Sequence, residues 1–303
     1  MSCSLGAVVA AIILVVSFVV PLAAGPYEDG IDSYKRGDYS TAMRQLRPLA
    51  DRGDASAQLM LGNIYSFGHG VPKDHAEAVK WFRKAADQGS ALAQLNLGVS
   101  YANGVGVPQD DTEAAKLYRK AADQGLANAQ SGLGNMYETG HGVAQDFAEA
   151  VKWYRKAADQ NFASAQFNLG GMYIRGQGVS QNYGEAIKWY RKAGDQRYAA
   201  AQYNLGVIYA NGQGAPQDYA EALSWYRKAA DQGHTGAQLN LGGMYFRGQG
   251  VPQDNIRAYV WFHLSAAQGN KDAKTVRDAM VELLTPTQLA DAKKLADEWK
   301  PAK

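Results

Sequence analysis

Residues 201–233 read Ala-Gln-Tyr-Asn-Leu-Gly-Val-Ile-Tyr-Ala-Asn-Gly-Gln-Gly-Ala-Pro-Gln-Asp-Tyr-Ala-Glu-Ala-Leu-Ser-Trp-Tyr-Arg-Lys-Ala-Ala-Asp-Gln-Gly. The chain repeats this pattern six times without insertion or deletion. The glycine that follows the leucine recurs every 36 residues, at Gly62, Gly98, Gly134, Gly170, Gly206 and Gly242. A fixed period of this length indicates a stacked array of small supersecondary units. Such an array has an extended surface, so binding of another macromolecule is the first function to test.

Composition and charge exclude several classes of partner. The chain has 31 basic and 29 acidic residues and a net charge of +2, so neither nucleic acid nor an anionic membrane surface is indicated as a ligand. Basic residues recur as Arg-Lys before Ala-Ala-Asp-Gln, where we expect them to face solvent near helix C-termini. The single cysteine, Cys3, excludes a disulfide framework and a cysteine-based metal site.

Residues 1–24 are expected to be a targeting segment. Leu5–Ala24 is an uncharged apolar run that ends in small residues, which is typical of a secretory signal cleaved after Ala24. No Lys or Arg precedes the run, and an apolar stretch of this length also suits an uncleaved membrane anchor. A cleaved signal predicts a periplasmic or secreted protein. An anchor predicts an inner-membrane protein whose repeats lie outside the cytoplasm.

Each repeat contains two short helical patterns. In the first, Leu61, Gly62 and Tyr65 share one helical face. A glycine inside a helix costs roughly 1 kcal/mol relative to alanine, so its recurrence predicts that a neighbouring helix approaches closely. We expect the contact to be the small residue near the start of the second helix, Ala78 in the first repeat.

The linker between the two helices ends in a predicted N-cap. Asp74 and Glu77 have the spacing of a capping box, and four other repeats have an equivalent pair. In the last repeat Asp254 is followed instead by Arg257.

The second helix has an aromatic pair and a predicted left-handed C-cap. Its pair is Trp81-Phe82 in the first repeat, and Leu117-Tyr118 in the second repeat is the exception. Gly89 suits a left-handed C-cap, whereas Arg197 at the same repeat position does not.

Two sets of residues resemble known repeat families. Leu-Gly-x-x-Tyr followed by Ala-x-x-x-aromatic resembles the tetratricopeptide scaffold, although Gln58 and its equivalents stand where that scaffold usually has Trp. The two-residue expansion, the linker Gly-x-Gly-Val-Pro-x-Asp and the final Lys-Ala-Ala-Asp-Gln-Gly resemble the Sel-one-like repeat family over residues 54–269. Some members of that family have a disulfide in every repeat, and this chain departs from them.

The resemblance implies a fold and a functional class. The expected fold is an all-α, right-handed α-solenoid of tetratricopeptide-like hairpins, about eight in number. Residues 25–53 are expected to form a degenerate N-terminal repeat, and residues 270–303 a helical cap in which Thr285 to Gln288 form a capping box. Family members act as adaptors in envelope signalling, in assembly of membrane complexes and in host contact.

The resemblance also implies a binding groove, because the first helix of each tetratricopeptide hairpin lines the concave side. Polar residues at offsets i, i+3 and i+7 share one face of these helices. The candidate groove residues are Asn63, Asn96, Asn103, Asn135, Asn168, Arg175, Asn204, Asn211, Asn240 and Arg247. Asparagine amides can hydrogen-bond an extended peptide backbone, and the arginines can bind its carboxylates. Alternatively, the asparagines only satisfy neighbouring helix ends and stabilise the array.

Residues that vary between repeats are further candidates for specificity, although core packing is the expected role of each. They are Phe67, Phe167, Ile174, Tyr203 and Phe246.

No catalytic, cofactor-binding or metal-binding residue is predicted. His69 and His141 share a repeat position but lie two repeats apart, too far to share a metal ion. The linker Gly-Gln-Gly-Val follows a helix and lacks the Gly-Lys-Ser/Thr of a phosphate-binding loop. We therefore predict a non-enzymatic scaffold that binds a protein or peptide. The alternatives are a β-lactamase-like hydrolase of cell-wall-related substrates, for which no activated nucleophile is visible, and a purely structural spacer.

Overall fold

The computed structural model describes residues 25–302, which contain sixteen α-helices, one short 3-10 helix and no strand. The predicted signal or anchor segment, residues 1–24, lies outside this range. The bounds are α1 Pro26–Lys35, α2 Tyr39–Asp51, α3 Ala55–Phe67, α4 His75–Asp87, α5 Ala91–Asn103, α6 Asp111–Asp123, α7 Ala127–Thr139, α8 Phe147–Asp159, α9 Ala163–Arg175, α10 Tyr183–Asp195, α11 Ala199–Asn211, α12 Tyr219–Asp231, α13 Thr235–Arg247, α14 Asn255–Ala267, α15 Lys271–Met280, η1 Val281–Leu283 and α16 Pro286–Glu298. Within residues 25–302, no helix is both long enough and apolar enough to span a bilayer.

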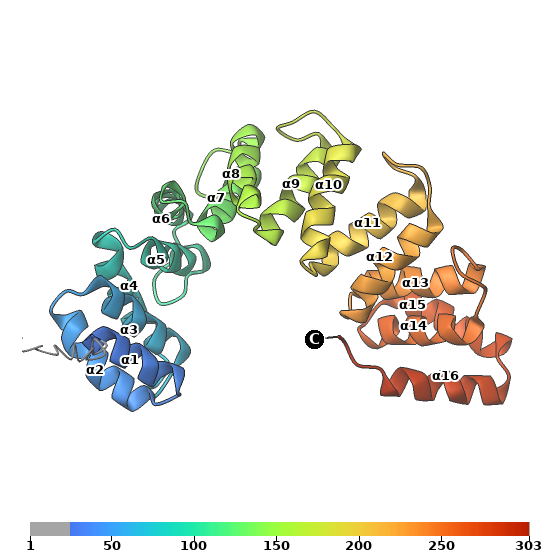
Figure 1. The fold of residues 1–303 in the computed structure, drawn as a ribbon, viewed down its shortest axis with the longest axis horizontal. Helices are drawn as coiled ribbons and strands as arrows, with labels where there is room; N and C mark the ends of the chain where they lie inside the picture. The colour runs from blue at the N-terminus through green and yellow to red at the C-terminus, as the bar shows by residue number, and fades with distance from the viewer. Residues whose placement is uncertain (1–24, 303) are drawn as a thin grey trace, which may run out of the picture.

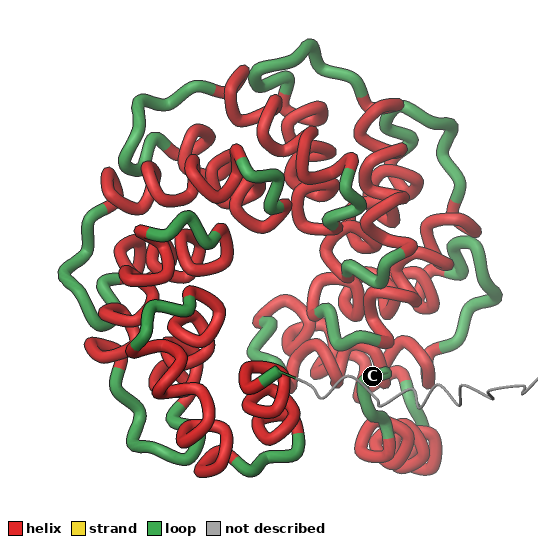
Figure 2. The backbone as a smooth tube through the Cα atoms, turned by 60° about the vertical axis from the view of Figure 1, so that its left-hand side comes forward, coloured by secondary structure: helices red, strands yellow, loops and turns green. Residues whose placement is uncertain are grey.

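The helices form an arch around an open centre (Figures 1 and 2). Helices α3 to α14 form six hairpins, and each hairpin packs mainly against the hairpins before and after it. We call α3, α5, α7, α9, α11 and α13 the first helices and their hairpin partners the second helices. The predicted α-solenoid is therefore confirmed. The last two helices do not form a further hairpin, since α15 and α16 both pack against α14.

The second helices begin at the predicted N-caps, but the capping boxes are incomplete. The Asp74 carboxylate accepts a hydrogen bond from the backbone N–H of Glu77 at 2.9 Å. The Glu77 carboxylate, however, does not reach back to the N-cap; it accepts from the indole N–H of Trp81 at 3.0 Å and pairs with Lys80. The reciprocal half of this prediction is wrong, because a donor one turn further along the same helix takes the carboxylate. The predicted capping box at Thr285 and Gln288 is complete.

The repeated glycine makes room for an aromatic ring. A Cβ placed on Gly206 would lie 2.5 Å from Cδ1 of Tyr226, and one on Gly62 would lie 2.4 Å from Cε1 of Phe82. The prediction that Ala78 is the contact is therefore wrong. In five of the six repeats the ring of the second helix lies directly against the backbone of the first and leaves no room for a methyl group; Gly98 is the exception.

A buried glutamine joins each repeat to the one before it. The side-chain amide of Gln58 donates to the carbonyl oxygen of Ala50 at 3.0 Å and accepts from Gln88 at 2.8 Å. The same pair of bonds recurs at Gln94, Gln130, Gln166, Gln202 and Gln238. The residue that replaces the tetratricopeptide tryptophan thus satisfies carbonyl groups at helix C-termini, which have no partner inside their own helix.

An arginine joins successive repeats on a different face. Arg191 on α10 donates to the hydroxyl of Tyr209 at 2.6 Å, and its guanidinium lies 5.9 Å from the centre of the Trp225 ring. Equivalent arginines contact the next tyrosine and tryptophan at Arg47, Arg119, Arg155 and Arg227. Cation–π contacts of this kind contribute about 0.5–1 kcal/mol at exposed sites.

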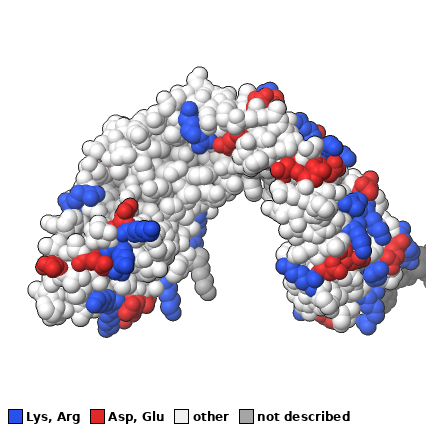
Figure 3. Space-filling model, turned by 180° about the vertical axis from the view of Figure 1, so that it is seen from behind, with Lys and Arg blue, Asp and Glu red and all other residues white. Residues whose placement is uncertain are grey.

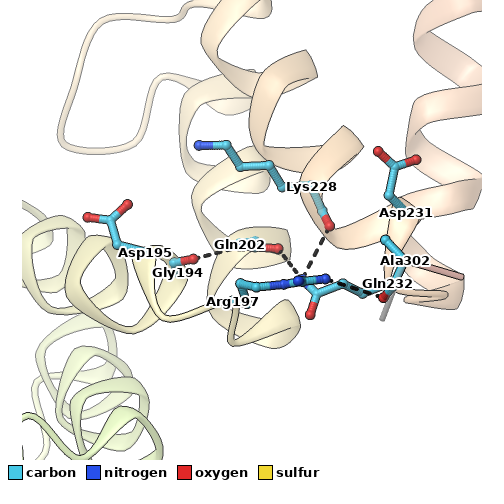
Figure 4. A pocket seen from close by; sticks show the side chains of 8 residues that line it. All are labelled: Gly194, Asp195, Arg197, Gln202, Lys228, Asp231, Gln232 and Ala302. Atoms are coloured by element: carbon cyan, nitrogen blue, oxygen red, sulfur yellow. Dashed lines mark hydrogen bonds between the residues drawn. The ribbon is translucent and has the colours of Figure 1, made fainter.

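The C-terminal tail returns to the array at the turn that contains Arg197 (Figure 4). The backbone N–H of Ala302 donates to the carbonyl of Asp231 at 2.7 Å, and the Arg197 guanidinium donates to the carbonyl of Ala302 at 3.3 Å. Arg197 has the left-handed φ of +66° that glycine has at this position in other repeats. Its contact with the tail offsets part of the strain of that conformation.

Candidate binding groove

The candidate groove is the inner side of the arch. Helices α5 and α7 lie on this side and α6 and α8 outside them (Figure 1). In the space-filling view the visible wall of the hollow beneath the arch is mostly free of charged side chains (Figure 3). All ten candidate groove residues are on first helices, and Asn103, Arg175, Asn211 and Arg247 are the last residues of theirs.

The groove asparagines already take part in contacts within the array. The Asn96 amide donates to the side-chain oxygen of Asn63 at 3.2 Å, which joins α5 to α3. Burial raises the pKa of Tyr226 to about 12, and the Asn240 side chain beside its hydroxyl acts in the opposite direction. An asparagine side chain has two donor and two acceptor positions, so one such contact leaves others for a ligand. The stabilising and binding roles are therefore compatible.

Two hollows open between successive first helices. The N-terminal hollow has a volume of 170 Å³ between α3 and α5 and includes the bonded pair Asn63 and Asn96. The C-terminal hollow has a volume of 370 Å³ between α11 and α13 and includes three candidate residues, Asn211, Asn240 and Arg247. The remaining candidate residues line neither hollow.

The N-terminal hollow has apolar side chains on its rim. Phe67 is 65% exposed, and Val99 and Val105 are 42% and 38% exposed. Phe67 stacks on His69 with 5.5 Å between ring centres, and His69 stacks on Tyr39 with 4.6 Å between ring centres. The expectation that Phe67 packs in the core is wrong, because its helix ends there and the ring projects beyond the hairpin. Of the other varying residues, Phe167, Ile174, Tyr203 and Phe246 are partly buried against the core, as expected.

The two groove arginines have different partners. Arg175 forms an ion pair with Glu138, with 2.6 Å between Nη2 and Oε1. Arg247 donates through Nε to Gln249 at 2.8 Å, and no carboxylate of residues 25–302 lies within ion-pair distance of it. The repeat position of the two arginines does not itself show this difference, because the acid that pairs with Arg175 comes from the preceding hairpin, 37 positions earlier.

The described residues contain no cluster of three or more His, Cys, Asp or Glu side chains arranged to bind a metal ion. Two of the histidines instead stack on aromatic rings, His69 on Tyr39 and His234 on Tyr203, with 4.6 Å between ring centres in each pair.

The comparisons with known proteins agree with this architecture. The family model "Sel1 repeat" matches residues 55–90, 91–126, 127–162, 163–198, 199–234 and 235–270. The chain is 41% identical to a protective antigen of uropathogenic Escherichia coli strains with an SLR fold; the TM-score is 0.78, and the match covers 84% of this chain and 56% of that one. This chain therefore spans little more than half the length of that relative.

A second solved structure, a Sel1 repeat protein from Oxalobacter formigenes, is 35% identical with a TM-score of 0.74, and the match covers 84% of this chain and 75% of that one. A search of the curated proteins gave no match. Proteins with these repeats generally mediate protein–protein interaction and are generally not enzymes. With six in-phase repeats covering most of its length and two structural relatives above 30% identity, the chain belongs to the Sel1 repeat family.

Proposed function

We propose that this protein is a non-enzymatic scaffold of the cell envelope that binds a protein or peptide partner along the inner side of its arch. The observation that carries the proposal is the exposure of Phe67 at the rim of the N-terminal hollow. Exposed aromatic side chains that are held rigid are typical anchors of protein interfaces, because their burial releases apolar surface at little entropic cost. The stack on His69 holds this ring in place.

The polar floor of the hollow supports a peptide as the ligand. Asn63 and Asn96 line this hollow and bond to each other with one donor and one acceptor, so each retains further hydrogen-bonding positions. A peptide backbone needs such donors and acceptors at regular spacing, and the array repeats its first helices regularly. Signalling, complex assembly and host contact remain the roles proposed for such a scaffold.

The envelope location rests on the apolar run Leu5–Ala24, which suits either a cleaved signal or an anchor. N-terminal sequencing of the exported protein distinguishes the two: a chain that begins at Gly25 supports cleavage, and retention of Leu5–Ala24 supports the anchor.

Site-specific photo-crosslinking tests the groove. A photoreactive amino acid at position 67 is expected to capture a partner in intact cells, and Phe67→Ala is expected to abolish capture from a second groove position such as Val99. Leu295, on α16, is a matched control because it is 50% exposed but lies on the C-terminal helix. Capture that is equal at positions 67 and 295, or unaffected by Phe67→Ala, would contradict the proposal.

A purely structural spacer can be distinguished from the proposed scaffold by the effect of shortening the array. Deletion of residues 127–162, one complete repeat, would disturb a spacer more than any groove substitution, whereas the proposed scaffold depends on Phe67.

A further inference from the structure

Arg175 and Arg247 occupy the same position of the repeat, two repeats apart, and face different residues. Glu138, 37 positions before Arg175, holds its guanidinium in an ion pair of 2.6 Å. The residue 37 positions before Arg247 is Ala210, which is therefore the repeat equivalent of Glu138. Ala210 lines the C-terminal hollow. The hollow between α11 and α13 thus lies at the place that corresponds to the Glu138 carboxylate between α7 and α9.

Both arginines are held in the same way. Each follows a second glycine by four residues, and a Cβ placed on Gly171 or Gly243 would lie 3.0 Å from the guanidinium of its arginine. Each also donates through Nε to a glutamine of the following linker, Gln177 or Gln249. Repeats without a groove arginine have a larger residue in place of this glycine. The larger residues are Asn63, Val99, Asn135 and Val207. The glycine therefore seats the guanidinium against its own helix.

The surroundings of Arg247 suit an anion. Arg247 lines the hollow, and no carboxylate of residues 25–302 pairs with its guanidinium. Asn211 and Asn240 line the same hollow and add amide donors, and Tyr203 and Tyr219 supply apolar walls with hydroxyl groups. A guanidinium binds a carboxylate through charge-assisted hydrogen bonds, which are about twice as strong as neutral ones.

We infer that the C-terminal hollow binds the side-chain carboxylate of a partner glutamate, in the place that Glu138 takes at Arg175. This inference rests on the proposed function, since the glutamate belongs to the bound protein or peptide. It assigns the partner an acidic residue at the α11–α13 end of the groove, and it leaves the α3–α5 end for an apolar residue beside Phe67.

Arginine side-chain NMR of the full chain tests the inference with small probes. N-acetylglutamate α-amide has only the side-chain carboxylate, N-acetylglutamine has only the terminal carboxylate, and N-acetylglutamine α-amide has neither. We expect the first probe to give a saturable shift of the Arg247 Nε–H signal, with a dissociation constant on the order of 1–10 mM for a bidentate pair of charge-assisted hydrogen bonds. The Arg175 signal is expected to stay unchanged, because Glu138 already occupies it.

Two substitutions should exchange the responses of Arg247 and Arg175 to the carboxylate probe. Ala210→Glu supplies the missing carboxylate from within, so the Arg247 response should be lost or weakened at least tenfold. Glu138→Ala removes the internal partner of Arg175, so a second saturable response should appear there. The gain at Arg175 cannot arise from a folding defect, which keeps the test informative if Ala210→Glu is unstable.

The other outcomes overturn the inference. A silent Arg247, or an equal response to the neutral probe, excludes a carboxylate site, and tighter binding of N-acetylglutamine assigns the hollow to a chain terminus instead. Failure here is distinct from failure of the proposed function, which is read at position 67: partner capture there with a silent Arg247 overturns only the glutamate site.

Discussion

The side-chain amide of Gln232 donates to the side-chain oxygen of Gln202 at 2.7 Å, and Gln202 itself donates to the carbonyl of Gly194 at 2.7 Å (Figure 4). These two bonds join the C-terminal ends of α10 and α12 through a side chain that is only 2% exposed. The same arrangement recurs in every repeat, so one hydrogen-bonded pair of glutamines lies in each of the six repeats.

Replacing Gln202 should lower the free energy of unfolding. Gln202→Met keeps the volume but removes one hydrogen bond from the Gly194 carbonyl, which still accepts from the Arg197 N–H, and one from the Gln232 amide, which still donates to the Lys228 carbonyl. We therefore expect the free energy of unfolding to fall by about 1–3 kcal/mol. Gln213→Met is the matched control, since Gln213 is exposed in a linker and should change stability by less than about 0.5 kcal/mol. Urea unfolding measures both. Equal effects would show that the buried bonds contribute nothing.

Gly206 and Gly98 occupy the same position of the repeat but have different neighbours. A Cβ on Gly206 would lie 2.5 Å from Tyr226, so Gly206→Ala should destabilise by about 1–3 kcal/mol through overpacking. A Cβ on Gly98 would meet Leu117 at an ordinary 3.4 Å, so Gly98→Ala should stabilise by about 0.5–1 kcal/mol through helix propensity. Thermal unfolding of the two variants should show shifts of opposite sign, and a shared sign would refute the difference in packing.

We expect the protein to lose stability in mild acid because of His234. Its Nδ1 accepts from the backbone N–H of Ala237 at 3.2 Å as the N-cap of α13, and burial lowers its pKa below the usual 6.5. The neutral form is therefore favoured by folding. Its contribution is complete above pH 6.5 and is lost as the pH falls through the lowered pKa, because the unfolded chain then binds the proton more readily.

The control for this effect is His234→Asn, which keeps an N-cap acceptor but does not titrate. Unfolding free energies at pH 7.5 and pH 5 should differ more for the native protein than for the variant. The comparison isolates His234 from His263, whose pKa is also lowered by burial. Identical pH dependence in the two proteins would exclude a contribution from His234.

Arg197 is expected to be a site of local strain. Its φ of +66° costs an L-residue roughly 1–2 kcal/mol, whereas the exposed hydrogen bond to Ala302 contributes about 0.5 kcal/mol. Arg197→Gly should therefore raise the free energy of unfolding by about 1 kcal/mol. Gly125→Ala, at an equivalent turn with φ +90°, should lower it by a similar amount. Chemical denaturation of both variants checks the pair, and a destabilised Arg197→Gly would mean that the tail contact outweighs the strain.

Most of the architecture could be predicted from the sequence because it depends on short-range interactions. The period of the glycine places each hairpin, and Asp74 begins α4 by bonding to a backbone N–H only three residues away. The left-handed turn at Gly89 depends only on its own backbone freedom. Such features need no knowledge of which surface faces which, so spacing alone determines them.

The candidate site depended on contacts between helices, which spacing does not record. Only the folded arch shows that Phe82 rather than Ala78 meets Gly62, and that Phe67 is exposed at the end of its helix. Only the arch shows that Arg175 is neutralised from the previous hairpin while Arg247 is not. The sequence by itself determined the repeat, the helices and their caps. The rotation between successive hairpins and the side-chain rotamers decided which polar groups pair with each other and which remain for a partner, because those contacts join different helices at separations of 30 to 37 residues.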